Sequence, residues 1–223
     1  MKYSELALMF KEFRESFHTT GAFIPSSRYL SREILKPWSH RTKPASILEV
    51  GPGTGAITKE LIQSLGKGDD AWIVELNEAF YLHLKEKFKS EPSWKKVAPL
   101  VHLIHGPVQE LTEDGRFDYL ICGLPFNNFP ASLVRSILRK FELLVKPGGT
   151  VSFFEYAAVR ELKSPMSPKE EKLRLASVGK SLKRFSAKHK NDAVLIARNL
   201  PPAWVNHVTL QSERTREKSK AAA

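Results

Sequence analysis

The segment that most constrains the fold is a mostly apolar run, Ile47 to Val50, that passes directly into the glycine-rich stretch Gly51-Pro52-Gly53-Thr54-Gly55. The run predicts a buried strand, and the glycines predict a tight turn at its carboxyl end. Glycine suits such a turn because it lacks Cβ, accepts a positive φ and lets a ligand approach the backbone. Apolar residues then recur at helical spacing from Ile57 to Leu65, which predicts a helix whose N-terminus points at that ligand.

The glycine spacing alone leaves two cofactor classes open. Gly51, Gly53 and Ala56 satisfy the dinucleotide pattern G-x-G-x-x-G/A. Glu49 before the first glycine and a further glycine at Gly55 give E-x-G-x-G-x-G, which resembles the first motif of class I S-adenosylmethionine methyltransferases. The resemblance implies that the loop lies against the methionine part of S-adenosyl-L-methionine, and that the acid acts at the same site through water or backbone.

A second carboxylate, Glu75, ends the next apolar run. In nucleotide-binding folds, a carboxylate that meets the ribose hydroxyls follows the glycines at a similar distance along the sequence. We therefore expect Glu75 and the adjacent Leu76 to contact the cofactor. The alternative is that Glu75 only caps a helix predicted over residues 77–88. After the third predicted strand no Asp follows to accept the adenine amine, so the backbone of Val108 and the side chain of Gln109 are expected to serve instead.

Strands and helices alternate along the middle of the chain, which is the pattern of an α/β sheet with crossover helices. We predict strands near 46–50, 71–75, 101–105, 117–122 and 150–156, and helices near 57–65, 77–88 and 131–145. Two further segments, 192–198 and 203–209, flank Pro201-Pro202 and predict a closing pair of strands. Seven strands with such a pair match a Rossmann-like class I methyltransferase sheet better than a dehydrogenase sheet.

Composition limits the partners. The chain has 223 residues, with 35 Lys and Arg against 24 Asp and Glu, and the net charge of +11 implies an anionic partner, either nucleic acid or anionic lipid. Cys122 is the single cysteine, which excludes a disulfide framework and a cysteine-rich zinc site, and no metal is expected. No apolar stretch is long enough for a membrane span and no signal peptide opens the chain, so we expect a soluble or peripheral cytoplasmic protein.

Two amphipathic segments bear on membrane contact. Residues 1–20 predict a helix with an aromatic stripe that includes Phe10 and Phe13, which either packs on the core or enters a bilayer interface. Residues 159–190 hold ten Lys and Arg against three Glu and a partly helical apolar face. This pattern is typical either of a helix on an anionic membrane or of a solvated helix outside the sheet. We therefore divide the chain into the helix 1–20, a catalytic domain over 21–210 with a basic insertion at 159–190, and a polar tail, 211–223.

The loop after the fourth predicted strand, residues 123–130, is expected to set the substrate class, since ligands of open α/β sheets bind at strand carboxyl ends. Its sequence GLPFNNFP resembles the N-L-P-Y or D-P-P-Y loop of amino-group methyltransferases, in which an Asn or Asp grips the amine of a flipped base. Gly123 stands at that position and Phe126 replaces the Tyr, so the side-chain acceptor for a base amine is missing. The charge and the LPF sequence favour an RNA adenine dimethyltransferase, and Gly123 opposes it.

Four ordered segments together resemble bacterial phospholipid N-methyltransferases: residues 21–30, the Glu49 loop, residues 123–130 and residues 199–203. The resemblance implies methylation of the amine of phosphatidylethanolamine, in steps that lead to phosphatidylcholine, or of ornithine lipids. It also implies a protein that associates peripherally with the cytoplasmic side of the inner membrane, with no nucleic-acid partner. Under this reading Ser26, Ser27 and Asn127 meet the substrate, while Phe10 and Phe13 meet the membrane.

The chemistry asks little of the protein, because the sulfonium is already a strong electrophile and the site has only to hold a neutral amine in line with the methyl group. Candidates that orient the amine or accept its proton are Tyr156, at the end of the fifth strand, and backbone carbonyls from Cys122 through Gly123 to Leu124. Tyr156 could equally be a core aromatic. A non-enzymatic scaffold that binds the cofactor at membranes is a third hypothesis.

Overall fold

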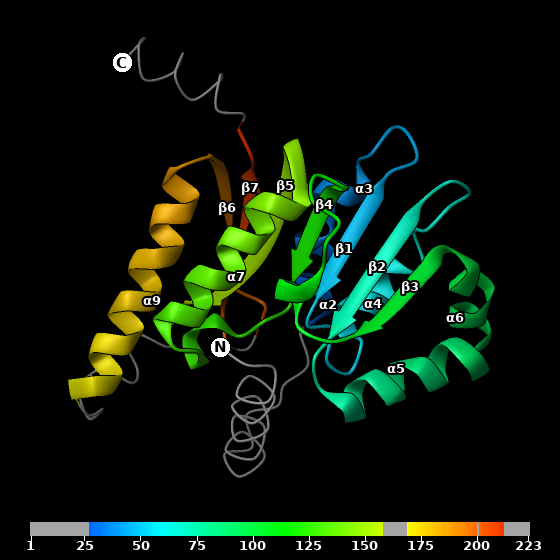
Figure 1. Cartoon of the computed structure of the whole chain (residues 1–223), viewed down its shortest axis with the longest axis horizontal. Coiled ribbons are helices and arrows are strands. Elements are labelled where there is room, and N and C mark those ends of the chain that lie inside the picture. Colours follow the sequence, from blue (N-terminus) through cyan, green and yellow to red (C-terminus); the bar gives the residue numbers. More distant parts are fainter. Residues whose placement is uncertain (1–26, 158–168, 200, 212–223) are drawn as a thin grey trace.

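The computed structural model describes residues 27–157, 169–199 and 201–211 of the chain. Seven strands in this part form one sheet with the order β3-β2-β1-β4-β5-β7-β6 (Figure 1). β1 to β5 pair in parallel, whereas β7 is antiparallel to both β5 and β6. The strands are β1 Ser46–Val50, β2 Asp70–Glu75, β3 Val101–His105, β4 Phe117–Cys122, β5 Val145–Tyr156, β6 Lys190–Ile196 and β7 Ala203–Thr209. The seven-stranded Rossmann-like sheet predicted from the sequence is confirmed, including its closing antiparallel pair.

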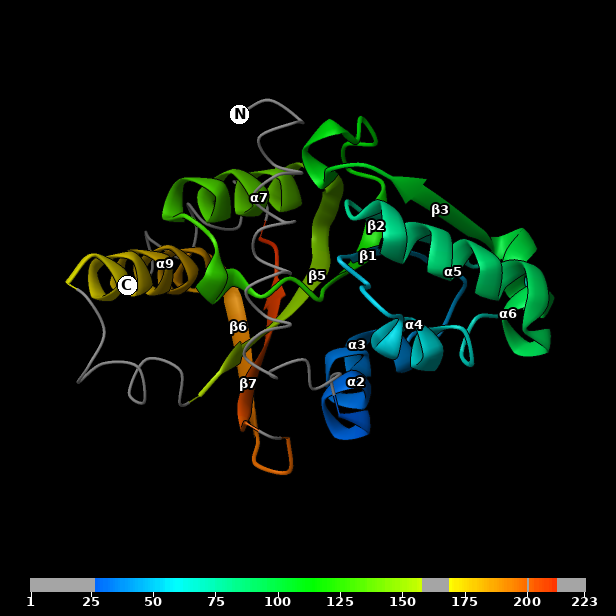
Figure 2. The ribbon, with the colours of Figure 1, turned by 90° about the horizontal axis from the view of Figure 1, so that it is seen from below.

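Helices cover both faces of the sheet. α7 and α9 lie on one face, and α2, α3 and α4 lie on the other (Figure 2). The helices are α2 Arg28–Ile34, α3 Lys36–Ser39, α4 Ala56–Leu61, α5 Glu78–Ser90, α6 Pro92–Val97, α7 Ala131–Leu144 and α9 Lys169–Ala187. Short 3₁₀ helices follow three of the loops: η1 Ala98–Leu100, η2 Val108–Glu110 and η3 Phe126–Asn128.

The central strand β1 is buried on both faces, as its apolar sequence predicts. Because successive side chains of a strand point to opposite faces, Leu48 enters the core beneath α7 while Ile47 packs in the cluster that contains Ile34 of α2 and Trp38 of α3. Glu49 follows Leu48, points to the same face as Ile47 and is fully buried. The sheet therefore positions a carboxylate in its own interior.

The predicted basic insertion is, from Lys169 onward, the helix α9 that connects β5 to β6. Its apolar face is buried in the core that also holds the inner face of α7, and the residues concerned are Leu175, Val178, Leu182 and Phe185. Leu173 is exposed. Of the two interpretations of this segment, the solvated helix on the outside of the sheet therefore describes the residues from 169 to 187, because their apolar face is covered by the protein itself.

Several sequence predictions concern residues outside the described ranges. These are the helix over 1–20 with Phe10 and Phe13, Ser26, the beginning of the 159–190 segment, and the tail from residue 212. Within the ranges that are described, no helix has both the length and the apolar character that crossing a bilayer requires.

Two of the four segments that carry the family resemblance meet in space. The Ser27 hydroxyl accepts a hydrogen bond from the Leu30 backbone at 3.3 Å and so caps α2, while the Ser27 backbone N–H donates to Asn199 Oδ1 at 3.2 Å. Asn199 is buried, and its Nδ2 donates to the Pro201 carbonyl at 2.7 Å. Ser27, predicted to meet the substrate, thus joins the start of α2 to the β6–β7 turn.

We expect Asn199→Ala to lower the free energy of unfolding by about 1–3 kcal/mol, because the Ser27 N–H and the Pro201 carbonyl would lose their partner in a buried position. Urea denaturation followed by circular dichroism measures this loss. Gln63→Ala, which removes an exposed amide at the end of α4, is the matched control and should change stability by less than about 0.5 kcal/mol. Equal effects of the two substitutions would show that the Asn199 link contributes nothing.

Candidate active site

A cleft lies at the carboxyl ends of the parallel strands. Three backbone hydrogen bonds fix the loops that form it: Gly51 N to Val74 O at 3.0 Å, Gly106 N to Glu75 O at 3.0 Å, and Gly123 N to Val50 O at 2.9 Å. Each bond continues the sheet one residue past a strand, so the loop that follows begins in a defined position. The cleft is small, with a volume of about 30 Å³, and it opens to solvent.

The structure brings together most of the predicted cofactor residues in this cleft. Gly51, Glu75, Leu76, Val108 and Gln109 line it, and so does Leu124, which is predicted to orient the amine. Five further residues line the cleft without having been predicted, namely Val50, Val74, Gly106, Pro107 and Ile137. A Gly-Pro pair directly after β3 was the signal that could have identified the first loop residues on that side, whereas nothing local marks Ile137, which arrives from α7.

Glycine is required at two positions of the first loop for different structural reasons. Gly51 has a φ of 72°, and a Cβ there would lie 2.4 Å from Leu124 Cδ2, so glycine lets the Leu124 side chain lie against the backbone. A Cβ on Gly55 would lie 2.9 Å from both Leu84 and Trp94. Gly55 is thus needed for packing of the loop against α5 and α6, and it does not line the cleft.

Glu75 ties the second strand to the glycine loop. Its Oε2 accepts a hydrogen bond from Gly53 N at 3.0 Å and its Oε1 accepts from Asn77 N at 2.7 Å. The cap of α5 is Asn77, whose Oδ1 accepts from Phe80 N at 3.1 Å, so Glu75 does more than cap that helix. Burial raises the pKa of Glu75, and these hydrogen bonds partly offset the rise. Each carboxylate oxygen still has a lone pair for a hydroxyl donor.

Glu49 is a buried carboxyl group without a hydrogen-bond partner. It lies on the face of β1 that Thr58 of α4 covers, and Thr58 stabilises the carboxylate only in part, because no hydrogen bond of regular geometry reaches either Glu49 oxygen or the Thr58 hydroxyl. Burial, with a smaller contribution from repulsion by Glu75, raises the pKa of Glu49 to about 8. A cation placed beside this group would lower that pKa and favour the carboxylate.

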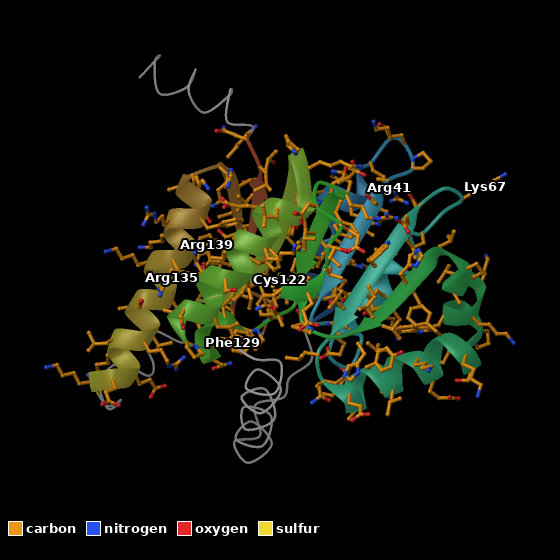
Figure 3. The ribbon with its side chains drawn as sticks, in the orientation of Figure 1. Arg41, Lys67, Cys122, Phe129, Arg135 and Arg139 are labelled. Atoms are coloured by element: carbon orange, nitrogen blue, oxygen red, sulfur yellow. The ribbon has the colours of Figure 1, made fainter. Side chains whose placement is uncertain are left out.

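The end of β4 approaches the glycine loop too closely for a side chain. A Cβ on Gly123 would lie 2.5 Å from the carbonyl oxygen of Gly51, which is backbone and cannot swing away. The preceding Cys122 is fully buried in the apolar core (Figure 3), and its burial raises the thiol pKa to about 12. The Cys122 side chain therefore packs in the core and does not line the cleft.

The rest of the loop after β4 is held from α9. Arg174 Nη1 donates hydrogen bonds to the backbone carbonyls of Asn127 and Phe129. Asn127 is buried, and its Oδ1 has no hydrogen-bond partner. Phe129 is buried near the start of α7 (Figure 3). α9, whose sequence suggested a membrane or surface role, thus fixes the loop that we expect to set the substrate class.

Tyr156 ends β5 and is half-buried on the sheet face that α2 covers. Its ring packs against Phe154 with 5.3 Å between ring centroids and an interplanar angle of 71°, and burial raises the pKa of its hydroxyl. No hydrogen bond joins that hydroxyl to another described residue. The ring is thus anchored, while its hydroxyl has a donor and an acceptor left over.

Comparison with known proteins identifies this architecture. Residues 47–149 match the family model of a methyltransferase domain. An ornithine lipid N-methyltransferase of Singulisphaera acidiphila is 28% identical over 138 residues, which cover 58% of this chain and 67% of that protein. The ribosomal RNA small subunit methyltransferase A of Mycoplasmoides gallisepticum is 27% identical over 104 residues, or 46% of this chain and 34% of that protein.

Solved structures confirm the fold class. The O-methyltransferase TomG from Streptomyces achromogenes, solved in complex with S-adenosylmethionine, superposes with a TM-score of 0.60 over 93% of this chain and 89% of that one, at 15% identity. The chain therefore has the fold of S-adenosylmethionine-dependent methyltransferases. Several curated relatives are far longer, and the chain spans about a third of the ribosomal enzyme and 3–5% of fungal polyketide synthases.

The described residues fit S-adenosylmethionine as the cofactor. Glu75 at the cleft offers carboxylate lone pairs to ribose hydroxyls, and apolar side chains such as Leu76, Val108 and Leu124 offer faces to the adenine ring. Glu49 is buried under the glycine loop without a hydrogen-bond partner, and it would become the counter-charge of the cationic methionine part, because a cation beside it lowers its pKa. No group of three or more His, Cys, Asp or Glu in the described ranges has the arrangement of a metal site.

We predict opposite effects of Glu49→Gln on stability and on cofactor affinity. Because the folded-state pKa of about 8 lies above the unfolded value of 4.5, the folded wild type holds an extra proton between these pH values and loses stability as pH rises through them. The Gln variant lacks this loss, so its advantage in free energy of unfolding should grow by up to about 1.4 kcal/mol per pH unit from about pH 5 to 8.

Urea denaturation at several pH values measures the stability difference, and calorimetry with S-adenosylhomocysteine measures affinity, which should fall in the variant. Glu60→Gln, on α4 and half-buried beside Arg32 at 3.2 Å, is the control and should show no such growth with pH. A wild type whose stability is as flat with pH as that of the Gln variant would contradict the raised pKa of Glu49.

Proposed function

We propose that this S-adenosylmethionine-dependent methyltransferase transfers methyl groups to the amine of a membrane lipid headgroup. The acceptors are phosphatidylethanolamine and its mono- and dimethyl derivatives on the sequence resemblance, and ornithine lipid on the relationship to the Singulisphaera enzyme. All of these acceptors carry an aliphatic amine, so they require the same chemistry of the site. The enzyme would act on the lipid at the membrane surface, with residues 1–20 as the predicted contact.

The observation that carries the proposal is the steric exclusion of a side chain at Gly123. An enzyme that methylates a planar base amine needs a side-chain acceptor at this point, because otherwise the second N–H of the amine is left without a partner in a desolvated pocket. The Cβ of such a residue would lie 2.5 Å from the Gly51 carbonyl oxygen, which is too close for a real contact. An aliphatic amine has no planar edge to be read, so the absence of that side chain costs it nothing.

The substrate loop has the properties that methylation of an aliphatic amine requires. When bound, S-adenosylmethionine would supply an electrophilic methyl carbon: the bond from this carbon to the positively charged sulfur breaks as the amine nitrogen bonds to the carbon, and S-adenosylhomocysteine leaves. The chain has to hold the amine neutral and in line, and to exclude water. Leu124 is an apolar wall of the cleft, and Phe126 packs in the core behind the loop. An amine beside Leu124 would be partly desolvated, which favours its neutral form. We assign the carbonyls of Gly123 and Leu124 and the Tyr156 hydroxyl to orienting its N–H groups.

A labelling experiment tests the substrate class. The purified chain is incubated with methyl-labelled S-adenosylmethionine and separate vesicles that contain phosphatidylethanolamine, ornithine lipid or only phosphatidylcholine, and with ribosomal RNA in a parallel tube. We expect label in an amino-lipid and none in RNA or in the phosphatidylcholine vesicles. Which amino-lipid is labelled distinguishes the two acceptors. Label in RNA alone would replace the proposal by the adenine dimethyltransferase, and cofactor binding without transfer to any acceptor would favour the scaffold.

Gly123→Ala tests the steric argument separately. Since its Cβ would overlap the Gly51 carbonyl, we expect the two loops to separate, with a lower melting temperature and at least tenfold weaker binding of S-adenosylhomocysteine. Gly66→Ala is the matched control, because a Cβ there meets only Asp69 Oδ2 at 3.8 Å, an ordinary contact. Unchanged cofactor affinity in Gly123→Ala would show that the site tolerates a side chain there, and the argument against a base substrate would fail.

A further inference from the structure

A hollow separate from the cofactor cleft lies between α7 and α9. It has a volume of about 490 Å³, and Arg135 and Arg139 of α7 face Lys180 and Arg184 of α9 across it. Figure 3 shows Arg135 and Arg139 between the two helices. A second hollow, of about 520 Å³, shares both arginines and extends along α7 to Gln109, which also lines the cofactor cleft. The two hollows form one groove that starts beside the active site, and we call it the α7–α9 groove.

The cations of this groove have no counter-charge in the part of the chain that the structure describes. In the described ranges none of the four, Arg135, Arg139, Lys180 and Arg184, takes part in an ion pair, although all four are exposed. A neighbouring basic residue, Lys140, does form an ion pair, with Asp114 at 3.0 Å. The groove therefore concentrates unpaired positive charge where two helices meet.

The carboxylate that lines the groove is already used. Glu142 accepts hydrogen bonds at its Oε1 from His189 Nε2 at 2.9 Å and from Lys188 Nζ at 2.6 Å. The bond from His189, followed by that from Lys188, lowers the pKa of Glu142 to about 2. Its charge is thus committed to the Lys188 and His189 pair, and it does not compensate the other four cations.

The walls of the groove suit an anion with several oxygens. Each pair of cations is spaced four residues apart on its helix, so the two pairs lie on matching faces and repel one another across the groove. The inner sides of the helices are held together by apolar contact, in which Leu138 and Phe185 take part at the floor of the groove. Guanidinium groups bind phosphate oxygens in pairs, and each bound oxyanion would relieve the repulsion.

We propose that the α7–α9 groove is a binding site for a phosphate-bearing anion, distinct from the methyl-transfer site. The cations line a concave space between helices, so the ligand is one whose phosphate enters the groove. Such a phosphate comes either from a free phosphorylated compound or from a lipid headgroup. The binding is independent of the identity of the methyl acceptor.

Occupation of the groove reaches the substrate loop by a short structural path. α9 carries Arg174, which holds the Asn127 and Phe129 carbonyls, and α7 begins at Ala131 directly after that loop. An anion that draws α7 and α9 together therefore stabilises the two elements between which the loop is fixed. The consequence is a folded state that is more resistant to heat when the anion is bound.

Calorimetry with pyrophosphate on the full chain tests the proposal. We expect saturable binding by the wild type and at least tenfold weaker binding by the double variant Arg135→Gln, Arg139→Gln. The control is Lys67→Gln with Lys89→Gln, which removes the same charge from exposed positions away from the groove and should bind as the wild type does. Lys67 lies at the opposite side of the molecule from the groove (Figure 3). Without pyrophosphate the groove variant should melt at a higher temperature than the wild type, because the repulsion is relieved, and pyrophosphate should raise only the melting temperatures of the wild type and the control.

Vesicles that contain phosphatidylglycerol distinguish the two sources of the phosphate. If pyrophosphate displaces the chain from them and the groove variant binds them less, the ligand is a lipid headgroup; if neither holds while pyrophosphate still binds the groove, it is a soluble compound. Either result supports the site. Equal pyrophosphate affinity in the groove variant and its control, or no saturable binding by the wild type, overturns it. A groove that binds single-stranded RNA but not pyrophosphate also overturns it, in favour of a nucleic-acid surface.

Discussion

The close approach of two backbone segments, Gly51 after β1 and Gly123 after β4, is the constraint on which the active site depends. The Gly123 N–H donates to Val50 O, and the Gly51 carbonyl occupies the space of any side chain at 123. This contact brings Leu124 against Gly51 and so forms one wall of the cofactor cleft. Cofactor site and substrate loop are thus one packed unit, and the same contact that shapes the cleft removes the side chain that a base-methylating enzyme would use.

Two buried acidic residues at the strand ends differ in their hydrogen-bond partners. Glu75 is satisfied by backbone N–H groups of the glycine loop and of Asn77, so it acts as a structural link as well as a candidate ligand. Glu49 is equally buried but has no hydrogen-bond partner, which is costly for a folded protein unless a cation compensates it. The cost of burying a carboxyl group without a partner therefore falls on Glu49, under the loop where the charged part of the cofactor is expected.

The excess positive charge of the chain has two roles in the described structure. Some basic side chains are structural: Arg41 bonds to Asp69 and to the Ser64 carbonyl and stacks on Trp38, at the edge of the sheet away from the cleft (Figure 3). Arg174 likewise holds the substrate loop. Four cations without an ion pair in the described ranges, Arg135, Arg139, Lys180 and Arg184, gather instead on the outer faces of α7 and α9, whose inner faces are used for packing. Net charge alone therefore says little about partners until the paired and unpaired groups are separated.

The sequence by itself determined the sheet, because hydrophobic runs, glycine turns and their alternation are local signals; β1, β3, β4 and β7 occur at the predicted residues. It also identified most of the cleft, since Gly51, Glu75 and Leu124 follow strand ends that a parallel sheet must bring to one edge. Tertiary structure alone decided what these residues do. That Gly55 packs on Trp94, that Ser27 binds Asn199, that α9 belongs to the core and that Gly123 meets the Gly51 carbonyl are all contacts between segments far apart in sequence. Such contacts depend on how whole elements pack, and no local pattern of residues encodes them.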